Sequence, residues 1–205
     1  MSKSRYVVTI TRQFGSMGRP IAKKIAEKLG VEYYDRDLVD KAAEKLNLPV
    51  STVKAEEETA KKKKSNPFRY MEYPMGGGTT ATQEKIFEAQ KNIIQFLAEK
   101  DTCVIVGRCS DFVLSEMENA VHIYIYASNE ARLKHCMEDL GMEEGEARRM
   151  IVSVDEAREA YHMNFAGYKP DDKRFKDIMI DSSFLGVEGT ADYLVQAIRQ
   201  KFDLG

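Results

Sequence analysis

The stretch TRQFGSMGRP, residues 11–20, has the residue types of a loop that binds a phosphate group. It follows the apolar run at residues 6–10, which predicts a buried strand, and it precedes a helical pattern. Gly15 and Gly18 permit backbone angles that other residues avoid, so N–H groups can turn toward an anion at the helix start. Arg19 adds a fork-shaped cation beside the loop. The alternative is an ordinary turn between a strand and a helix that carries surface cations.

Two further arginines directly follow predicted strands. Arg36 comes after the strand at residues 31–34, and Arg108 comes after the hydrophobic run CVIV at residues 103–106. Because parallel strands place their carboxyl ends at one edge of the sheet, both side chains are expected to reach the crevice beside the loop. Each arginine alone is compatible with an ordinary loop cation, but together they favour a phosphate site.

Another arginine lies inside a helical pattern. Residues 143–165 carry one apolar stripe, and Arg158 projects from within it. A guanidinium among apolar side chains is costly unless it is paired. Arg158 therefore either pairs with Asp155 or reaches water along its stem, or it points into a cleft to meet a phosphate group. Arg148 and Arg149 make the same segment basic, which favours the explanation that Arg158 points into a cleft to meet a phosphate group.

The order of the predicted strands and helices indicates the fold that positions these side chains. The expected strands are residues 6–10, 31–34, 103–106, 121–127 and 178–180. The expected helices are residues 20–29, 38–46, 83–100, 129–140, 143–165 and 191–202. Strands that alternate with helices predict an α/β fold with a central parallel sheet covered on both faces.

The composition limits the class of protein. The chain has 205 residues, 43% of them hydrophobic, which is typical of a single soluble globular domain over residues 1–205. The formal net charge of −2 argues against nucleic acid as a partner. No apolar run reaches the length of about 20 residues that crossing a membrane requires, and no signal-peptide core is present. Cys103, Cys109 and Cys136 lack metal-site spacing, which predicts reduced thiols and a cytoplasmic location.

Residues 50–82 interrupt this pattern with the stretches EEETAKKKKSNPF and GGGTT. We expect a solvated helix followed by a mobile loop. The alternative is a scaffold function, in which the lysine block at residues 61–64 docks an acidic partner.

Five segments, in this order, resemble the cytidylate kinase-like family, a branch of the nucleoside monophosphate kinases. They cover nearly the whole chain and read ITRQFGSMGRPIAKKIAEKLG, YYDRDLV, VIVGRCSDFVL, DEAR and IDSSFLGVEGTADYLVQAI. The resemblance implies a three-layer α/β/α P-loop NTPase fold with a central parallel sheet. It further implies a monophosphate-binding insertion at residues 50–82 and a helical lid at residues 128–168.

The resemblance also implies an activity, the ATP-dependent transfer of a phosphoryl group to a nucleoside monophosphate or a similar small phosphate acceptor. Mg²⁺ is the metal ion that this reaction usually uses. On this interpretation the catalytic residues are Arg158, Arg148 and Asp155. The donor phosphates lie on five loop residues, Gly15, Ser16, Met17, Gly18 and Arg19. The acceptor is held by Asp35, Arg36 and Arg108, and the metal ion by Ser16, Asp35 and Asp111.

The sequence departs from the pattern of that family at four positions. Gln13 replaces the glycine that opens the loop, Arg19 replaces its lysine, and Pro20 replaces the hydroxyl residue that usually contacts Mg²⁺. Cys109 stands where cytidylate kinases carry an aspartate, and Asp111 is the substitute two residues later. Three functions therefore remain open: a kinase, a non-catalytic nucleotide- or phosphate-binding sensor built on a kinase fold, and the scaffold function of the lysine block.

Overall fold

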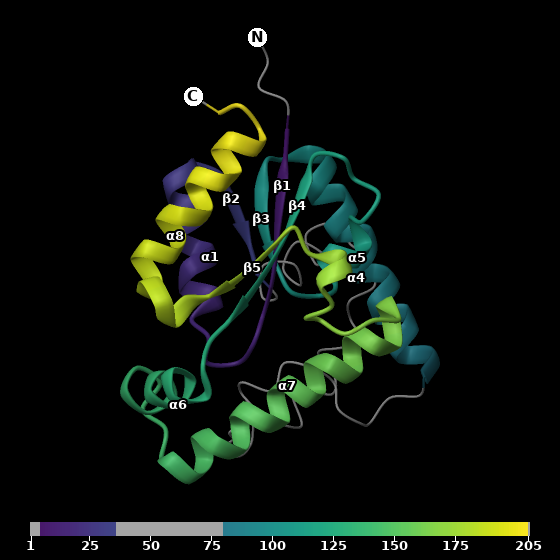
Figure 1. The fold of residues 1–205 in the computed structure, drawn as a ribbon. Helices are drawn as coiled ribbons and strands as arrows, with labels where there is room; N and C mark the ends of the chain where they lie inside the picture. Colours follow the sequence, from purple (N-terminus) through teal and green to yellow (C-terminus); the bar gives the residue numbers. More distant parts are fainter. Residues whose placement is uncertain (1–4, 36–79, 205) are drawn as a thin grey trace.

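The computed structural model describes residues 5–35 and 80–204, which form a five-stranded parallel sheet flanked by helices (Figure 1). The strands are β1 (Val7–Arg12), β2 (Glu32–Tyr34), β3 (Cys103–Val106), β4 (Ala120–Tyr126) and β5 (Ile178–Asp181). They lie in the order β2-β3-β1-β4-β5, and every neighbouring pair is parallel. The expected parallel sheet is thus confirmed.

The central strand β1 is buried along its whole length because it lies between β3 and β4. Its side chains alternate between two apolar layers. Val8 and Ile10 pack on one face in the cluster that contains Ile25, whereas Val7 packs on the other face with Ile94. A strand buried on both faces reads as a continuous apolar run, which is the pattern that predicted it.

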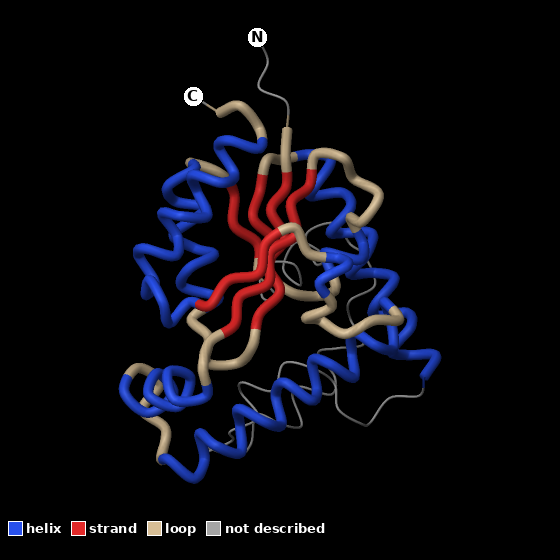
Figure 2. Tube along the Cα trace, viewed as in Figure 1, coloured by secondary structure: helices blue, strands red, loops and turns tan. Residues whose placement is uncertain are grey.

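Helices cover both faces of the sheet (Figures 1 and 2). On one face lie α1 (Gly18–Leu29) and α8 (Ser182–Lys201), and on the other lie α4 (Thr80–Lys100) and the short α5 (Ser110–Val113). The remaining helices, α6 (Asn129–Glu138) and α7 (Glu144–Ala166), lie beyond the carboxyl ends of the strands (Figure 1). The expected three-layer α/β/α fold is therefore confirmed.

One helix begins earlier than expected, and one short helix was not expected. α8 begins at Ser182 rather than at residue 191, and Gly186 interrupts it with a non-helical backbone (φ 66°, ψ −175°). The pattern at residues 191–202 corresponds to the part of α8 that packs on the core. The sequence patterns also missed α5, because four residues are too few to show a helical period.

Several expected features lie outside the described residues. These are the helix at residues 38–46, the lysine block at residues 61–64, and Arg36. Of the insertion at residues 50–82, the structure describes only the last three residues, which belong to α4. Within residues 5–35 and 80–204, no helix combines the length and the apolar character that a membrane span requires.

Candidate functional site

The loop between β1 and α1 lies at the carboxyl edge of the sheet, as expected for a phosphate-binding loop. Gly15 and Met17 adopt left-handed backbone angles, with φ of 75° and 59°. Gln13 fixes the start of the loop: its N–H donates to the carbonyl of Ile125 at 3.0 Å, and its Oε1 accepts from the N–H of Ala127 at 3.1 Å. Gln13 thus anchors the loop to the end of β4 at the position where phosphate-binding loops usually have glycine.

The start of α1 has the features of an anion site. The first N–H groups of a helix have no intrahelical acceptor. In α1 no side chain caps them, and the first turn contains no acidic residue. Gly18 and Arg19 open the helix, so the positive end of the helix dipole lies at the loop.

Ser16 is directed away from this anion site. Its Oγ–H lies 3.0 Å from the carbonyl oxygen of Gln13 and 3.2 Å from that of Ile125, and the residue is fully buried. Its own carbonyl accepts from the hydroxyl of Ser182 at 2.7 Å. Ser16 therefore holds the loop against β4 and the start of α8.

Arg12, the last residue of β1, brings a guanidinium to the site that the sequence patterns did not predict. The residue is only 7% exposed. Its Cβ and Cγ lie 2.7 and 2.8 Å from the point where a Cβ on Gly18 would stand, and its Nη1 lies against the corresponding point on Gly107. Two glycines on different elements therefore make the space that the Arg12 side chain occupies.

The turn after β3 has a strained backbone. Gly107, Arg108 and Cys109 follow one another with φ of 77°, 58° and 52°. Non-glycine residues rarely adopt the left-handed region, and each such residue costs about 1 kcal/mol or more. Strain of this kind is concentrated at functional sites, so the turn is a candidate ligand-binding segment.

Arg158 reaches the end of β1 from α7. Its Nη1 donates to the carbonyl oxygen of Arg12 at 3.0 Å. Its Nε is buried and has no hydrogen-bond partner in the described part of the chain. The expected pair with Asp155 is wrong, because the carboxylate of Asp155 forms an ion pair with Arg132 of α6 instead.

The ion pair between Arg132 and Asp155 ties α6 and α7 to the loop. Asp155 accepts from the N–H of Phe14 at 2.7 Å, and Nε of Arg132 donates to the carbonyl of Phe14 at 2.7 Å. The ring of Phe14 is buried in a cluster with apolar residues of both helices, among them Cys136 and Val154. Sequence reasoning did not single out Arg132, although an arginine in an apolar helical setting was the signal that singled out Arg158.

Arg12, Arg108 and Arg158 come together in the lining of one pocket. Its other lining residues are Thr11, Gly107, Cys109, Tyr161, His162 and Pro170. The pocket therefore joins the carboxyl ends of β1 and β3 to α7. We call it the arginine pocket.

Arg148 does not line the arginine pocket. It lies in the first turns of α7, is largely exposed, and pairs with Glu144 at 2.7 Å. The structure thus brings Arg158 and Arg108 together but leaves Arg148 near the other end of the helix (Figure 1).

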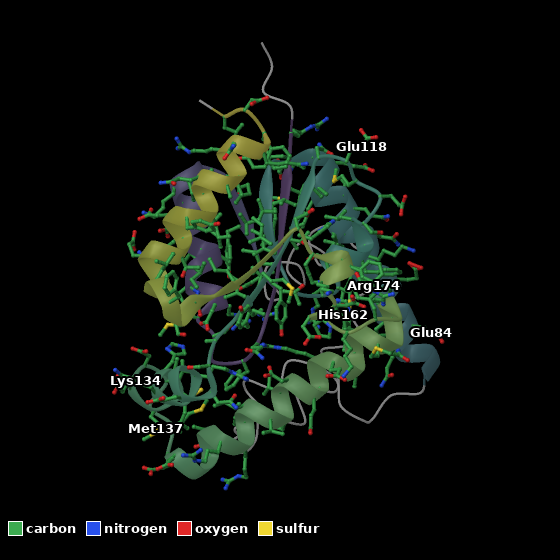
Figure 3. The ribbon with its side chains drawn as sticks, in the orientation of Figure 1. Glu84, Glu118, Lys134, Met137, His162 and Arg174 are labelled. Atoms are coloured by element: carbon green, nitrogen blue, oxygen red, sulfur yellow. The ribbon has the colours of Figure 1, made fainter. Side chains whose placement is uncertain are left out.

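Asp111 is buried behind the arginine pocket among three donors. It accepts from Nε2 of His162 at 3.2 Å, from the hydroxyl of Tyr168 at 3.2 Å and from Nζ of Lys176 at 2.5 Å. Burial alone would raise the pKa of Asp111, but His162 and Lys176 outweigh burial and hold that pKa well below its ordinary value. His162 lies in the last turns of α7 (Figure 3). We call these four residues the Asp111 cluster.

Asp35 stands at the end of β2, half-buried, and accepts from the hydroxyl of Tyr33 at 3.5 Å. Burial and the charge of Asp35 raise the pKa of Tyr33 to about 12, although Arg19 and Arg12 act in the opposite direction. The end of β2 is therefore within electrostatic reach of both arginines.

The residues expected to hold Mg²⁺ do not form a three-ligand site. Mg²⁺ requires oxygen ligands, usually carboxylates, water and substrate phosphates. The hydroxyl of Ser16 faces carbonyls, the carboxylate of Asp111 faces three donors, and burial raises the pKa of the Cys109 thiol, which stays neutral. Asp35 is the remaining member of the expected set. Across the described residues, no group of three or more His, Cys, Asp or Glu side chains is placed to hold a metal ion.

Comparisons with known proteins agree with this geometry. A family model described as "Cytidylate kinase-like family" matches residues 7–184. A crystal structure of an uncharacterized protein from Eubacterium ventriosum is 26% identical, with a TM-score of 0.69, over 98% of this chain and 100% of that chain. No curated protein matches the sequence.

Two kinases of known name share the fold at low identity. Shikimate kinase from Bacteroides thetaiotaomicron is 13% identical, with a TM-score of 0.53, over 98% of this chain and 100% of that chain. A gluconokinase from Sinorhizobium meliloti is 11% identical, with a TM-score of 0.56, over 98% of this chain and 96% of that chain. These structures establish a P-loop kinase fold for the chain.

Proposed function

Because the chain belongs to the cytidylate kinase-like family, we propose that it transfers a phosphoryl group from ATP to a nucleoside monophosphate or a similar small phosphate acceptor. Gly15–Arg19 at the start of α1 bind the donor phosphates, because uncapped N–H groups and a helix dipole meet there. The acceptor phosphate enters the arginine pocket. Asp35 and Arg36, after β2, complete the acceptor site.

The observation that carries this proposal is the arginine pocket itself. Three guanidiniums, which stay charged at every physiological pH, line one small space. The buried Nε of Arg158 has no acceptor in the described part of the chain, and an unmatched buried donor costs about 1–3 kcal/mol. A phosphate group supplies several acceptor oxygens and negative charge, so it removes both costs at once.

Phosphoryl transfer depends on positioning and on neutralising negative charge rather than on covalent chemistry by the protein. Arg158 is placed to meet the transferring group because it reaches from α7 to the end of β1, beside the donor loop. Asp155 is a positioning residue: with Arg132 it holds α7 against Phe14 of the loop. Residues 128–168 then act as a lid whose position is coupled to the donor loop.

Arg148 has a role in this scheme only when the lid changes position. In the described conformation it pairs with Glu144 on the exposed face of α7. Closing of the first turns of α7 over the bound donor would bring its guanidinium toward the phosphates.

The residues expected to bind Mg²⁺ are poorly suited to do so, and this favours a second function. Ser16 and Asp111 are committed to other partners, and Pro20 offers no hydroxyl. A non-catalytic sensor of nucleotide or phosphate needs the loop and the arginine pocket but no metal site. In this alternative the protein binds the same ligand but does not catalyse phosphoryl transfer.

An assay with ATP and a panel of nucleoside monophosphates, with Mg²⁺ or with EDTA, tests the proposal. We expect one acceptor to yield ADP and a nucleoside diphosphate, with turnover far above that of an Arg158→Met control. Binding measured by equilibrium dialysis separates the alternatives. Nucleotide binding without turnover above the control supports the sensor, and absence of both binding and turnover contradicts both functions.

A further inference from the structure

The side chain of Arg12 is held in a defined place by the backbone around it. Its Cβ and Cγ pass beside Gly18, where even a methyl group would not fit, and its Nη1 lies against Gly107. The residue is only 7% exposed, and it lines the arginine pocket. A guanidinium that is already positioned loses little conformational freedom when an anion binds.

Arg12 also fixes a second cation of the pocket. Its carbonyl oxygen accepts from Nη1 of Arg158 at 3.0 Å, so both arginines meet at one residue of the sheet. The Nε of Arg158 is buried without a hydrogen-bond acceptor in the described residues. Arg108 enters the pocket from the strained turn after β3. The pocket therefore concentrates positive charge from β1, from α7 and from that turn.

None of the described residues that line the same pocket is a carboxylate. In P-loop kinases a hydroxyl residue after the loop lysine and a carboxylate hold Mg²⁺, and the metal ion neutralises the phosphates. Here Pro20 takes the place of that hydroxyl residue, and β3 ends in Val106 without a following acid. Asp111 already faces Lys176 at 2.5 Å. Positive side chains thus surround the pocket where this class of protein normally presents metal ligands.

We propose that Arg12 performs the neutralising role of the divalent cation, so that the arginine pocket binds a phosphate group without Mg²⁺. The inference rests on the proposed function because it concerns the same pocket. It goes further because it assigns the neutralising charge to Arg12 and states that phosphate binding does not require Mg²⁺. The ligand class is a phosphate dianion or a phosphomonoester, which offers one oxygen to each of several guanidinium forks.

The test measures the binding of inorganic phosphate and of pyrophosphate to the full chain by isothermal titration calorimetry. Each titration is run at constant ionic strength, once with Mg²⁺ and once with EDTA. We expect the dissociation constants in the two buffers to agree within about threefold, because protein cations supply the charge. This arm uses the unmodified chain, so it does not depend on the folding of any variant.

Substitutions then identify the cation. Arg12→Met is expected to weaken phosphate binding by about tenfold or more, and Arg12→Lys by less, because the point charge is kept and the fork is lost. Arg199→Met is the matched control, since Arg199 lies in the last turn of α8, at the opposite end of the sheet from the pocket (Figure 1).

Phosphate binding that disappears in EDTA overturns the inference. So does binding by folded Arg12→Met at the affinity of the unmodified chain, and so does absence of phosphate binding. The proposed kinase activity fails separately: no turnover with any acceptor would remove it while leaving metal-independent phosphate binding intact. Turnover combined with phosphate binding that is lost in EDTA would support the kinase activity and contradict metal-independent binding.

Discussion

Two adjoining regions of this molecule bury charged side chains, and they balance the charges in different ways. In the Asp111 cluster, one carboxylate meets donors from His162, Tyr168 and Lys176, all within 3.2 Å. In the arginine pocket, three guanidiniums line one space, and the Nε of Arg158 has no acceptor among the described residues. The imidazole of His162 belongs to the first region and also lines the second.

The difference separates charge that stabilises the fold from charge that prepares for a ligand. A buried carboxylate with its full set of donors is satisfied by the protein, and removal of one partner is strongly destabilising. Guanidiniums around one pocket repel each other, and an anion that enters the pocket reduces that repulsion. On the proposed function, this contrast assigns the Asp111 cluster to the fold and the arginine pocket to ligand binding.

The backbone follows the same division. The residues that carry strain, Arg108 and Cys109, directly precede α5, whose first turn contains Asp111. One short segment thus changes from left-handed turn to regular helix as it passes from the pocket to the cluster. A strained backbone persists only where the surrounding structure holds it, and the Asp111 cluster begins two residues after the strained turn.

The largest expected effect tests the functional side of the comparison. Once an acceptor is known, Arg158→Met is expected to lower turnover by about 10³-fold, as the loss of a phosphate-stabilising arginine does. The melting temperature is expected to stay the same or rise slightly, because Met suits the apolar stripe of α7 better than a guanidinium whose buried Nε has no acceptor among the described residues. Turnover and melting temperature are measured on the same preparations.

Arg158→Lys is the companion variant. It is expected to restore little activity, since an ammonium group cannot reproduce the two-pronged contact. Equal activity in Arg158→Met and the unmodified chain would remove the catalytic role. A strongly destabilised Met variant would assign Arg158 to the structural side of the comparison.

The second prediction tests the structural side. Asp111→Asn is expected to lower the free energy of unfolding by about 3 kcal/mol at neutral pH, because Lys176 and His162 lose their buried counter-ion. Urea unfolding monitored by circular dichroism measures this. The control is Asp192→Asn, at an exposed carboxylate paired with Lys28, which is expected to change stability little.

The pH dependence of Asp111 has a definite sign. Its pKa in the folded protein lies below that of an unfolded carboxyl group, about 3.9, so its contribution is complete above that value. The contribution is lost as the pH falls from there toward the folded pKa. The gap in stability between the unmodified chain and Asp111→Asn should therefore narrow below about pH 4. A gap that stays constant down to pH 2 would show that the carboxylate charge is not what stabilises the cluster.

The sequence predicted the side of the site that local patterns encode. Strand ends located the phosphate loop and Arg108, because a buried parallel strand reads as an apolar run and its ligand-facing residues follow directly. The apolar stripe of α7 likewise identified Arg158 as an unusual arginine. These inferences need only residues that are close in the chain.

What the sequence could not predict depends on packing between distant segments. Arg12 lies in the predicted loop, two residues after the expected strand, and its place between Gly18 and Gly107 requires two elements to come together. Asp155 was assigned to Arg158 because they are three residues apart, yet its partner is Arg132 of another helix. The direction of the Ser16 hydroxyl likewise depends on β4. Partner choice in the interior is set by tertiary geometry, which proximity in the chain does not encode.

The last prediction concerns the boundary between the two regions, where the expected effects are smallest. Arg108→Ala and Arg108→Gly both remove the guanidinium, so each is expected to weaken phosphate binding by about tenfold. They differ in the backbone, since position 108 has φ of 58° and glycine adopts this conformation without strain. The free energy of unfolding of Arg108→Gly should therefore be about 1 kcal/mol higher than that of Arg108→Ala. Calorimetric titration with phosphate and urea unfolding measure the two quantities on the same pair of proteins. If both variants bind phosphate like the unmodified chain but lose several kcal/mol of stability, far beyond the range of about 1 kcal/mol expected here, Arg108 serves the fold. The boundary between charge for folding and charge for ligand would then lie inside the pocket, between Arg108 and Arg158.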